Sequence, residues 1–361
     1  MQPVCVIADD FTGAAEMAGI AWQFGHRTIL LRDPVPSQAD ADVVVYDAST
    51  RNLPPDEAAD RLRAFCRVAD VARIFKKIDS ALRGNVLPEA RAMLNTLRRR
   101  RAIILAQNPS RGRTIAGGIY RIDGVPITQT FFRDDPDHPV TIDHVVTRLD
   151  PTGAFGARSV AVPPGGSDSD IVLADADAAA HVERWAEHVS DDDLPVGGSD
   201  FFIAVLHRWL TRKPCAPTSL ASPARRLHVC GTASRPPDVR LSTVQLKRPD
   251  PTELASASER HRHIAAYIGG PIDRTPGSAE RLQRQLIDAV GPVVRSGRIG
   301  QLLVEGGATA AALFDELRWS QFEIVTELAT GVVALRSCAA RDLVILTKPG
   351  SYDWPATLFI A

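Results

Sequence analysis

Short runs of apolar and β-branched residues alternate with longer segments of helical periodicity along the first 110 residues. This alternation is typical of a mainly parallel sheet flanked by helices, the α/β fold class. The predicted strands are Val4–Ala8, Thr28–Leu31, Val43–Asp47, Arg73–Ile78 and Ala102–Gln107. The predicted helices between them are Gly13–Phe24, which stops at Gly25, Pro55–Val68 and Pro88–Arg99.

The pattern changes after Pro109. Two extended runs flank Asp123-Gly124, a pair that tolerates the positive φ angles of a tight turn, so a β-hairpin excursion is expected there. The stretch 213–226 is rich in proline and small polar residues, which break both periodicities and indicate a linker. We therefore predict two α/β domains, residues 1–225 and 226–361.

The second half of the chain repeats the alternation of strands and helices after residue 225. Before that boundary, residues 163–200 of the first domain are expected to be loop around one helix, about Asp177–Val189. In the second domain, residues 248–258 are expected to be a connection. The predicted strands of the second domain are Leu227–Cys230, Gln301–Val304 and Leu343–Thr347. Its predicted helices are Glu259–Ile268, Ser278–Val294 and one that follows residue 304.

The charge balance and the cysteines exclude several classes of protein. Among 361 residues, 42 are basic and 43 are acidic, so no global field favours nucleic acid or an anionic membrane as a partner. The five cysteines are scattered and never spaced as CxxC, which argues against a disulfide framework or a structural zinc site. No apolar window reaches 18 residues, and a cytoplasmic location is expected.

Polar residues gather at the ends of the predicted strands of the first half. In open parallel sheets, ligands bind outside the carboxyl ends of the strands. These ends carry Asp9, Asp10, Thr12 and Gly13; Thr50 and Arg51; Lys76, Lys77, Asp79, Ser80, Arg83, Gly84 and Asn85; and Arg111 and Arg113. Cations can hold a carboxylate or phosphate while carboxylates accept from hydroxyl groups. The mixture therefore suits a small polyhydroxylated anion.

Each of these groups also has a purely structural interpretation. Asp10 or Thr12 can cap the helix that begins near Gly13. One helix needs one cap, however, so the second aspartate stays unexplained. Asp79 and Arg83 are spaced as an ordinary i,i+4 pair on a helix surface, and Lys76 and Lys77 can mark an exposed strand end.

The second half carries glycines at three predicted strand ends. A Glu-Gly-Gly turn, Glu305 to Gly307, precedes an alanine-rich helix whose free N–H groups favour an anion. The predicted strand Leu227–Cys230 is followed by Gly231, Thr232 and Ser234, and the predicted strand Leu343–Thr347 is followed by Lys348, Gly350 and Ser351. The segment between the strands Gln301–Val304 and Leu343–Thr347 adds Glu327 and Gly331. A lone glycine turn is more often a tight connection, but three together favour a site for nucleotide phosphates.

Five motifs resemble those of the four-carbon acid sugar kinase family, which includes threonate, erythronate and 3-oxo-tetronate kinases. They are "IADDFTGAAEMAG", "FKKIDSALRGN", "GRTIAGGIYRIDGVPITQTFFRDDPDHPV", "VEGGATA" and "TKPGS". The resemblance implies an N-terminal domain that binds the sugar acid and a C-terminal domain that binds ATP. It also implies transfer of a phosphoryl group to a terminal hydroxyl in the cleft between them.

The resemblance also implies which residues bind each ligand. For the sugar acid they are Asp9, Asp10, Thr12, Gly13, Thr50, Arg51, Lys77, Asp79, Ser80, Arg83 and Gly84. For the nucleotide they are Gly231, Thr232, Ser234, Gly306, Gly307, Ala308, Thr309, Lys348 and Gly350. Ala308 departs from the family pattern, which has an acidic residue there, and Glu305, just before the glycines, is a candidate to substitute for it. The segment "KPGSYDWP" and the loop "CGTASRP" also depart from that pattern.

These residues lead to a hypothesis about the mechanism. Arg51, Lys77 and Arg83 would hold the substrate carboxylate, and Asp79, preferred over Asp10, would take the proton from the attacking hydroxyl. ATP would enter with Mg²⁺, for which the sequence identifies no ligand. A homodimer is compatible with this hypothesis. The alternative is a sugar-acid-binding or regulatory protein without competent ATP chemistry; a phosphatase fits less well, because its two acids would stand two residues apart.

Overall fold

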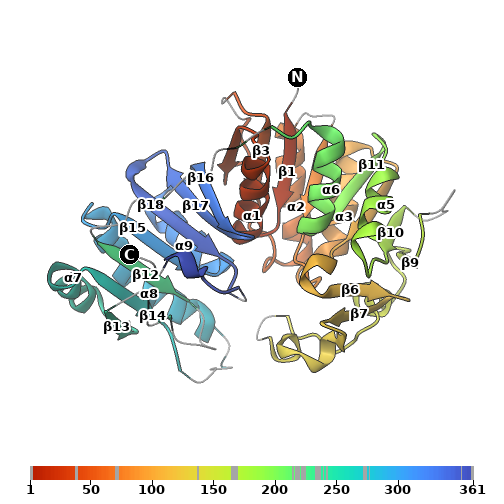
Figure 1. Cartoon of the computed structure of the whole chain (residues 1–361). Coiled ribbons are helices and arrows are strands. Elements are labelled where there is room, and N and C mark those ends of the chain that lie inside the picture. The colour runs from red at the N-terminus through yellow and green to blue at the C-terminus, as the bar shows by residue number, and fades with distance from the viewer. Residues whose placement is uncertain are drawn as a thin grey trace. The chain divides into compact units, whose positions relative to one another are not determined.

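The chain packs as two compact units (Figure 1). The computed structural model describes residues 3–36, 40–69, 73–135, 138–163, 170–213, 215, 220, 225–231, 237–238, 240, 243–270, 275, 277–350 and 352–358. Unit 1 contains Met1–Asp9 and Asp33–Lys213, and unit 2 contains Asp10–Arg32 and Pro214–Ala361. The segment from Asp10 to Arg32, expected in the first domain, thus packs with the second unit.

Unit 1 is built on a parallel sheet, as the alternation of short apolar runs and helices predicts. Its strands lie in the order β3 (Val43–Asp47), β1 (Val4–Ala8), β4 (Ile74–Lys77), β11 (Asp193–Gly197), β5 (Arg101–Leu105), β10 (Ile171–Ala174) and β9 (Arg158–Val160). All of these neighbours pair in parallel. Residues 163–200, expected to be loop around one helix, contain β10 and β11; both strands are short and lie in a segment rich in glycine, proline and aspartate, which hides their pattern.

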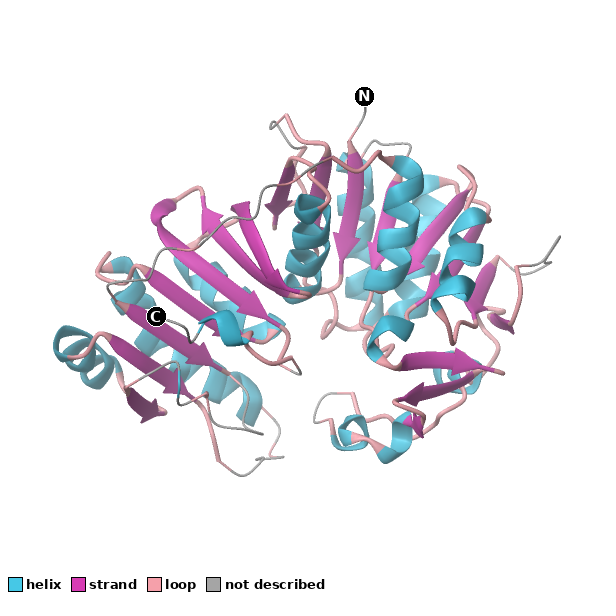
Figure 2. Cartoon of the chain, in the orientation of Figure 1, coloured by secondary structure: helices cyan, strands magenta, loops and turns pink. Residues whose placement is uncertain are grey.

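Helices cover both faces of this sheet (Figures 1 and 2). One face carries α2 (Pro55–Val68) and α3 (Val86–Leu97), and the other carries α5 (Ala179–Glu187) and α6 (Ser199–Trp209). A short helix, α4 (Val145–Leu149), precedes β9.

The predicted hairpin excursion is present in unit 1. A small antiparallel sheet contains β6 (Arg113–Ala116), β7 (Ile119–Ile122) and β8 (Val125–Pro126). Asp123 and Gly124 form the turn between β7 and β8, both with positive φ. Three single-turn helices flank the hairpin: η1 (Pro109–Arg111), η2 (Ile127–Gln129) and η3 (Phe131–Asp134).

In unit 2 the sheet is parallel on one side and antiparallel on the other. Its parallel strands lie in the order β13 (Val244–Lys247), β14 (His263–Tyr267), β12 (Arg226–Cys230), β15 (Gln301–Glu305) and β18 (Ala340–Lys348). The antiparallel strands β17 (Val332–Ser337), β16 (Gln321–Ala329) and β2 (Thr28–Leu31) continue it. Its helices are α1 (Phe11–Gln23), α7 (Pro251–Arg260), α8 (Ser278–Arg295) and α9 (Gly307–Leu317), with one turn, η5 (Ala356–Leu358), near the C-terminus.

Aromatic packing explains why α1 belongs to unit 2. The helix is apolar on nearly its whole surface, so it must be covered on more than one side. The Phe11 ring lies 4.7 Å from that of Phe314 in α9 and 5.3 Å from that of Phe322 in β16, centroid to centroid. Burial of such rings outweighs the short chain connection to β1, which is why local pattern could not reveal the assignment.

One stretch of unit 2 was predicted wrongly. Residues 251–260 form helix α7 instead of a connection, and residues 263–267 form strand β14 instead of a helix. The Asp250 side chain caps α7 by accepting from the backbone N–H of Glu253 at 2.8 Å, and Pro251 is favoured at the first helical position. None of the described helices combines the length and the apolar character needed to cross a membrane.

Candidate functional site

Asp9 directly follows strand β1 in unit 1, and its carboxylate faces Arg51. Arg51 follows β3 and donates Nε–H to Oδ2 of Asp9 at 2.8 Å and Nη2–H to Oδ1 at 3.0 Å. Such a bidentate pair is both strong and directional. Burial opposes ionisation of Asp9, but the Arg51 guanidinium outweighs it and holds the pKa of this carboxyl below its usual range. Both predicted residues therefore belong to one rigid pair.

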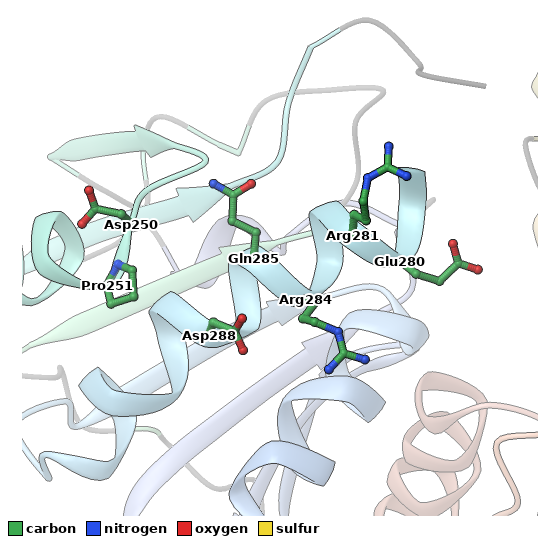
Figure 3. A pocket seen from close by; sticks show the side chains of 7 residues that line it. All are labelled: Asp250, Pro251, Glu280, Arg281, Arg284, Gln285 and Asp288. Carbon is green, nitrogen blue, oxygen red and sulfur yellow. The ribbon is translucent and has the colours of Figure 1, made fainter. Parts of the chain in front are cut away.

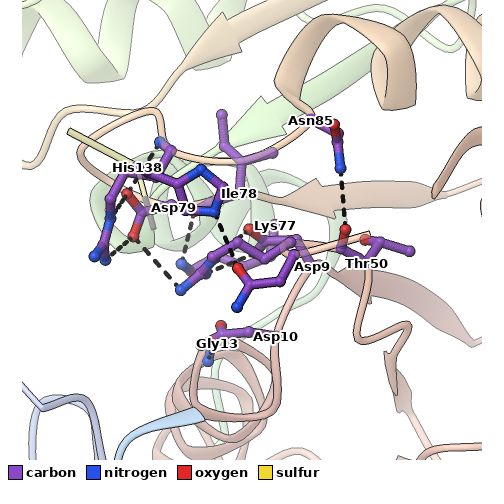
Figure 4. Close-up of polar contacts among 12 residues, drawn as sticks. Asp9, Asp10, Gly13, Thr50, Lys77, Ile78, Asp79, Asn85 and His138 are labelled. Carbon is purple, nitrogen blue, oxygen red and sulfur yellow. Dashed lines mark hydrogen bonds and ion pairs between the residues drawn. The ribbon is translucent and has the colours of Figure 1, made fainter. Parts of the chain in front are cut away.

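Asp79 follows β4 and is the most heavily hydrogen-bonded carboxylate of this region (Figure 4). It accepts from the backbone N–H groups of Ala81 at 3.0 Å and Arg83 at 3.2 Å. The Arg83 side chain adds Nε–H and Nη2–H bonds of 2.9 and 2.8 Å, and Arg51 Nη1 lies 3.7 Å from Oδ1. Burial raises the pKa of Asp79, but these cations and bonds hold it well below its usual range. Asp79 is therefore ionised and a weak base.

The hairpin excursion brings three groups that the sequence analysis did not assign to a site. Asp135 accepts from Arg83 Nη1 at 2.7 Å, and the Phe132 ring lies 5.1 Å from the Arg83 guanidinium. His138 Nε2 lies 3.0 Å from Oδ1 of Asn52 (Figure 4). The only signal for them was their place in the long family motif, because no spacing of histidines or acids pointed to them.

The remaining predicted residues of unit 1 surround the same loops. Lys77 is buried and donates from Nζ to the Ile78 carbonyl at 2.8 Å. Ser80 Oγ accepts from Arg113, and the Thr50 carbonyl accepts from Asn85 at 3.1 Å. Gly84 has a φ of 80°, and a Cβ there would lie 2.9 Å from Cγ of Arg51. Thus Lys77 is not an exposed strand end.

Lys76, on the opposite face of β4, forms a fully buried ion pair. Its Nζ lies 2.7 Å from Oε2 of Glu89 in the first turn of α3, and the two side chains are 0% and 1% exposed. Burial raises the pKa of the Glu89 carboxyl, an effect that Lys76 opposes. Nothing in the sequence pointed to Glu89, because a glutamate in a first helical turn is common on surfaces.

Asp10, the second aspartate of the motif "IADDFTGAAEMAG", caps a helix in unit 2. Asp10 is the N-cap of α1 and accepts from the Gly13 backbone N–H at 2.9 Å and the Thr12 hydroxyl at 2.8 Å. Successive side chains of an extended segment point to opposite sides. The two adjacent carboxylates therefore have separate partners.

Asp10 also lies against the glycine turn of unit 2. A Cβ on Gly307 would lie 2.2 Å from Oδ2 of Asp10 and 3.1 Å from Oγ1 of Thr12. Gly307 begins α9, so the carboxylate lies beside a helix N-terminus. The glycine is required here by the close approach of a side chain.

We expect Gly307→Ala to displace Asp10 and to destabilise the chain by roughly 1–3 kcal/mol, the range found for overpacking a well-packed site. Urea denaturation of the variant and the parent measures this effect. Gly350→Ala is the matched control, because a Cβ at Gly350 would have no atom within 4 Å. Equal stability of the two variants would contradict the predicted contact.

The other glycines predicted for the nucleotide site, Gly231, Gly331 and Gly350, lie at the same edge of its sheet. Parallel strands end at one edge, and β16 runs parallel to β15 and β18 because two antiparallel steps separate it from β18. A Cβ on Gly231 would lie 1.8 Å from Oγ1 of Thr309, and one on Gly331 2.5 Å from the Tyr352 ring. Ala308 is exposed at this edge. Thr232 and Ser234 lie outside the described residues.

Glu305 and Lys348 form a buried ion pair beneath these turns. Lys348 Nζ lies 3.0 Å from Oε2 of Glu305, and the side chains are 1% and 5% exposed. Burial opposes ionisation of Glu305, but the hydrogen bond from His228 and the charge of Lys348 lower its pKa to about 2. The Glu305 carboxylate is thus ionised and pairs with the Lys348 ammonium in this structure.

This low pKa gives a prediction about acid stability. Because the folded-state pKa of Glu305 is depressed from 4.5 to about 2, its contribution is complete above pH 4.5 and is lost as the pH falls toward 2. Its full size is on the order of 3 kcal/mol, of which more than half is lost by about pH 3. The difference in unfolding free energy between the parent and Glu305→Gln, measured by urea denaturation, should therefore shrink between pH 6 and pH 3. A constant difference would contradict the assignment.

A separate hollow of about 420 Å³ lies between α7 and α8 (Figure 3). It is lined by Asp250, Pro251, Glu280, Arg281, Arg284, Gln285 and Asp288. None of the predicted site residues lines it. Its wall carries both negative carboxylates and positive guanidinium groups. It gives no indication of a particular ligand.

Each unit therefore presents its own kind of chemistry. Unit 1 joins carboxylates and guanidinium groups at the ends of β1, β3 and β4, an arrangement suited to a small ligand with a carboxylate and hydroxyls. Unit 2 presents glycine turns and a helix N-terminus, an arrangement suited to phosphate groups. Among the described residues, no group of three or more His, Cys, Asp or Glu could hold a metal ion.

Comparison with known proteins finds two family models that match this chain. A family model described as a sugar-binding N-terminal domain matches residues 4–201, and one described as a nucleotide-binding C-terminal domain matches residues 242–352. A D-threonate kinase from Salmonella typhimurium is 24% identical, over 98% of this chain and 96% of that protein. A 3-oxo-tetronate kinase from Brucella melitensis is 26% identical, over 99% and 94%.

A solved structure supports the fold. A Salmonella typhimurium protein, described as a putative tRNA synthase, matches with a TM-score of 0.79 and 20% identity, over 100% of this chain and 98% of that one. At this identity the likeness concerns the fold alone. The two family models and the full-length relatives together show that the chain belongs to the four-carbon acid sugar kinase family.

Proposed function

We propose that this chain is an ATP-dependent kinase that phosphorylates the terminal hydroxyl of a four-carbon sugar acid, such as threonate, erythronate or an oxo-tetronate. The observation that carries the proposal is the network of Asp9, Arg51, Asp79 and Arg83 in unit 1. Full-length relatives named as D-threonate and 3-oxo-tetronate kinases support the same substrate class. The cytoplasm, where ATP is available, is the expected location.

In unit 1, the guanidinium groups of Arg51 and Arg83 would hold the carboxylate of the acid. Asp9 and Asp79 fix both arginines through short ion pairs, so little side-chain entropy is lost when the acid binds. Thr50, Lys77, Ser80 and Gly84 complete the same set of loops. The excursion would contribute Asp135 and His138 as partners for the hydroxyl groups.

In unit 2, the turn at Gly306 and Gly307 and the N-terminus of α9 would receive the phosphates of ATP. Gly231 and Thr309 contact each other beside that turn, and Gly331 and Gly350 lie at the same edge. Mg²⁺ would enter with ATP, and no residue of this chain is proposed as its ligand. Mg²⁺ bound in this way would neutralise charge on the β- and γ-phosphates.

Asp10 is a better candidate than Asp79 for the base that accepts the proton of the attacking hydroxyl. Asp79 is clamped by four hydrogen bonds from Ala81 and Arg83, which make it a weak base. Asp10 lies against Gly307 and is joined by one peptide bond to Asp9 of the acid site. As the hydroxyl oxygen bonds to the γ-phosphorus, its proton would pass to Oδ of Asp10, and ADP would leave.

The test is an ATP-consumption screen over threonate, erythronate and their oxidised derivatives. Mass analysis of the product should show one added phosphoryl group on the terminal carbon of the preferred acid. Calorimetry with acid and with ATP·Mg in separate runs shows whether each ligand binds. Binding of an acid without any nucleotide binding would overturn the proposal and support a regulatory protein. The molar mass in solution shows whether the chain forms a homodimer.

A further inference from the structure

Glu305 accepts hydrogen bonds from three groups besides Lys348. His228 Nε2 and Trp354 Nε1 each lie 2.7 Å from Oε1, and Cys230 Sγ lies 3.7 Å from Oε2. Because Glu305 is ionised, Nε2 of His228 must carry the proton and donate it to this bond. His228 Nδ1 is buried and has no hydrogen-bond partner among the described residues. The carboxylate therefore has donors from β12, from β18 and from the C-terminal segment.

These partners join three strand ends and the C-terminal segment of unit 2. His228 and Cys230 belong to β12, Glu305 to β15 and Lys348 to β18, and all three strands are paired. The backbone N–H of Gly306 also donates to the Lys348 carbonyl at 3.0 Å. We call His228, Glu305, Lys348 and Trp354 the Glu305 cluster.

Trp354 is the member that the chain supplies from outside the sheet. Its ring packs in an apolar cluster with Leu303 and Leu346, and only Nε1–H turns toward the carboxylate. Lys348 Nζ lies 5.3 Å from the centre of this ring, within the range of a cation–π contact. The indole thus contacts both charges of the ion pair.

A buried charge cluster of this kind is costly for a stable core. Apolar side chains of similar volume are often as stable as a buried ion pair, or more so. Lys348 is 1% exposed and its charge is already matched by Glu305, so it is not placed for a direct contact with a ligand. What the cluster does fix is the relative position of the turns after β12, β15 and β18, which carry Gly231, Gly306 and Gly350.

We propose that the Glu305 cluster is a positioning device that holds these glycine turns in register for nucleotide phosphates, an inference that rests on the proposed kinase function. Glu305 is then a positioning residue instead of a nucleotide contact that replaces the missing acid at Ala308. Trp354 is a second positioning residue, which the sequence analysis did not identify. Phosphate binding by backbone N–H groups depends on their geometry more than on any one side-chain charge.

The test compares Trp354→Phe with Trp319→Phe. The first keeps an aromatic ring but removes the Nε1–H donor to Glu305. The second is a matched control in the same unit, because the Trp319 ring stacks on Phe314, with 6.0 Å between the ring centres, and is not part of the Glu305 cluster. Loss of one hydrogen bond to a charged group predicts about a tenfold rise in the Kd for ADP and in the KM for ATP with Trp354→Phe. The KM for the acid should stay at the parent value.

Glu305→Gln gives a second measurement of the same effect. It keeps the side-chain size but removes the charge, and should also weaken ADP binding while leaving acid binding intact. Folding of each variant is checked by its thermal midpoint. Parent-like ADP affinity in folded Trp354→Phe, or an equal rise in the KM for both substrates, would overturn the inference.

The outcome also separates this inference from the proposed function. A parent that phosphorylates an acid while Trp354→Phe binds ADP normally overturns the inference alone. A parent that binds ADP but phosphorylates none of the acids overturns the kinase assignment. The ratio of the Kd for ADP of Trp354→Phe to that of the parent still decides the inference in that case. A parent that binds no nucleotide overturns both.

Discussion

Asp10→Asn is expected to lower kcat for the preferred acid by about two to four orders of magnitude, the contribution of a positioned general base. The substitution keeps the shape of the side chain but removes its negative charge and its ability to accept a proton. Asparagine is as good an N-cap as aspartate, so the bond from the Gly13 N–H to Oδ1 and the stability of α1 should persist, while Nδ2–H, in place of Oδ2, would donate to the Thr12 hydroxyl. Steady-state kinetics with saturating ATP and acid, together with a urea denaturation curve, measure both properties.

Asp79→Asn is the informative comparison for that experiment. Asp79 holds Arg83 through two side-chain bonds and lies 3.7 Å from Arg51, so its loss should loosen the groups proposed to bind the carboxylate. We expect its main effect to be a higher KM for the acid. A large fall in kcat for Asp79→Asn with little change for Asp10→Asn would show that Asp79 is the base, as the sequence analysis preferred.

The sequence predicted elements well where a local pattern is complete. Strands β1, β3 and β4 combine apolar runs with polar ends, and their bounds agree with the prediction to within one residue. The turn at Asp123 and Gly124 was equally clear, because both residues adopt positive φ. These elements position the carboxylates and guanidinium groups of unit 1, which is why that region could be located from the sequence.

The errors occurred where packing or capping decides the outcome. The segment 263–267 is a short apolar run that periodicity alone cannot distinguish from a buried helix. Asp250, followed three residues later by Glu253, is an N-cap pattern that predicts the start of α7, and the sequence prediction did not use it. The assignment of α1 to unit 2 depends on aromatic contacts with residues about 300 positions later.

The candidate site shows the same distinction between residue type and residue partner. Its residue types could be predicted, because strand ends in a parallel sheet gather at one edge. The partners could not. Arg83 is shared between Asp79 and Asp135, and Asp135 comes from the excursion, which no spacing rule connects to β4. Glu89 could not be predicted for the same reason. Only the structure shows that Lys76 is buried beside it.

Lys76→Met is expected to destabilise the chain by about 3–5 kcal/mol, the cost of leaving one member of a buried ion pair without its partner. Methionine matches the length of the lysine stem, so the loss comes from the uncompensated carboxylate of Glu89 instead of a cavity. The exposed fractions of the two side chains, 0% and 1%, leave no water to replace the missing cation. Urea denaturation at pH 7 measures the effect. The pKa of Glu89, already raised by burial, should rise further as this carboxyl becomes neutral.

The double variant Lys76→Met/Glu89→Leu shows whether the pair itself is needed for stability. Apolar residues of similar volume can replace a buried ion pair at little cost, so the double variant should recover most of the stability lost by Lys76→Met. Its affinity for the acid is then decisive, because Lys76 also lowers the pKa of Asp9. Recovered stability with weaker acid binding would mean that the chain retains this costly pair for the charge state of Asp9. Failure of the double variant to recover would instead mean that the pair is a structural requirement of the packing between β4 and α3.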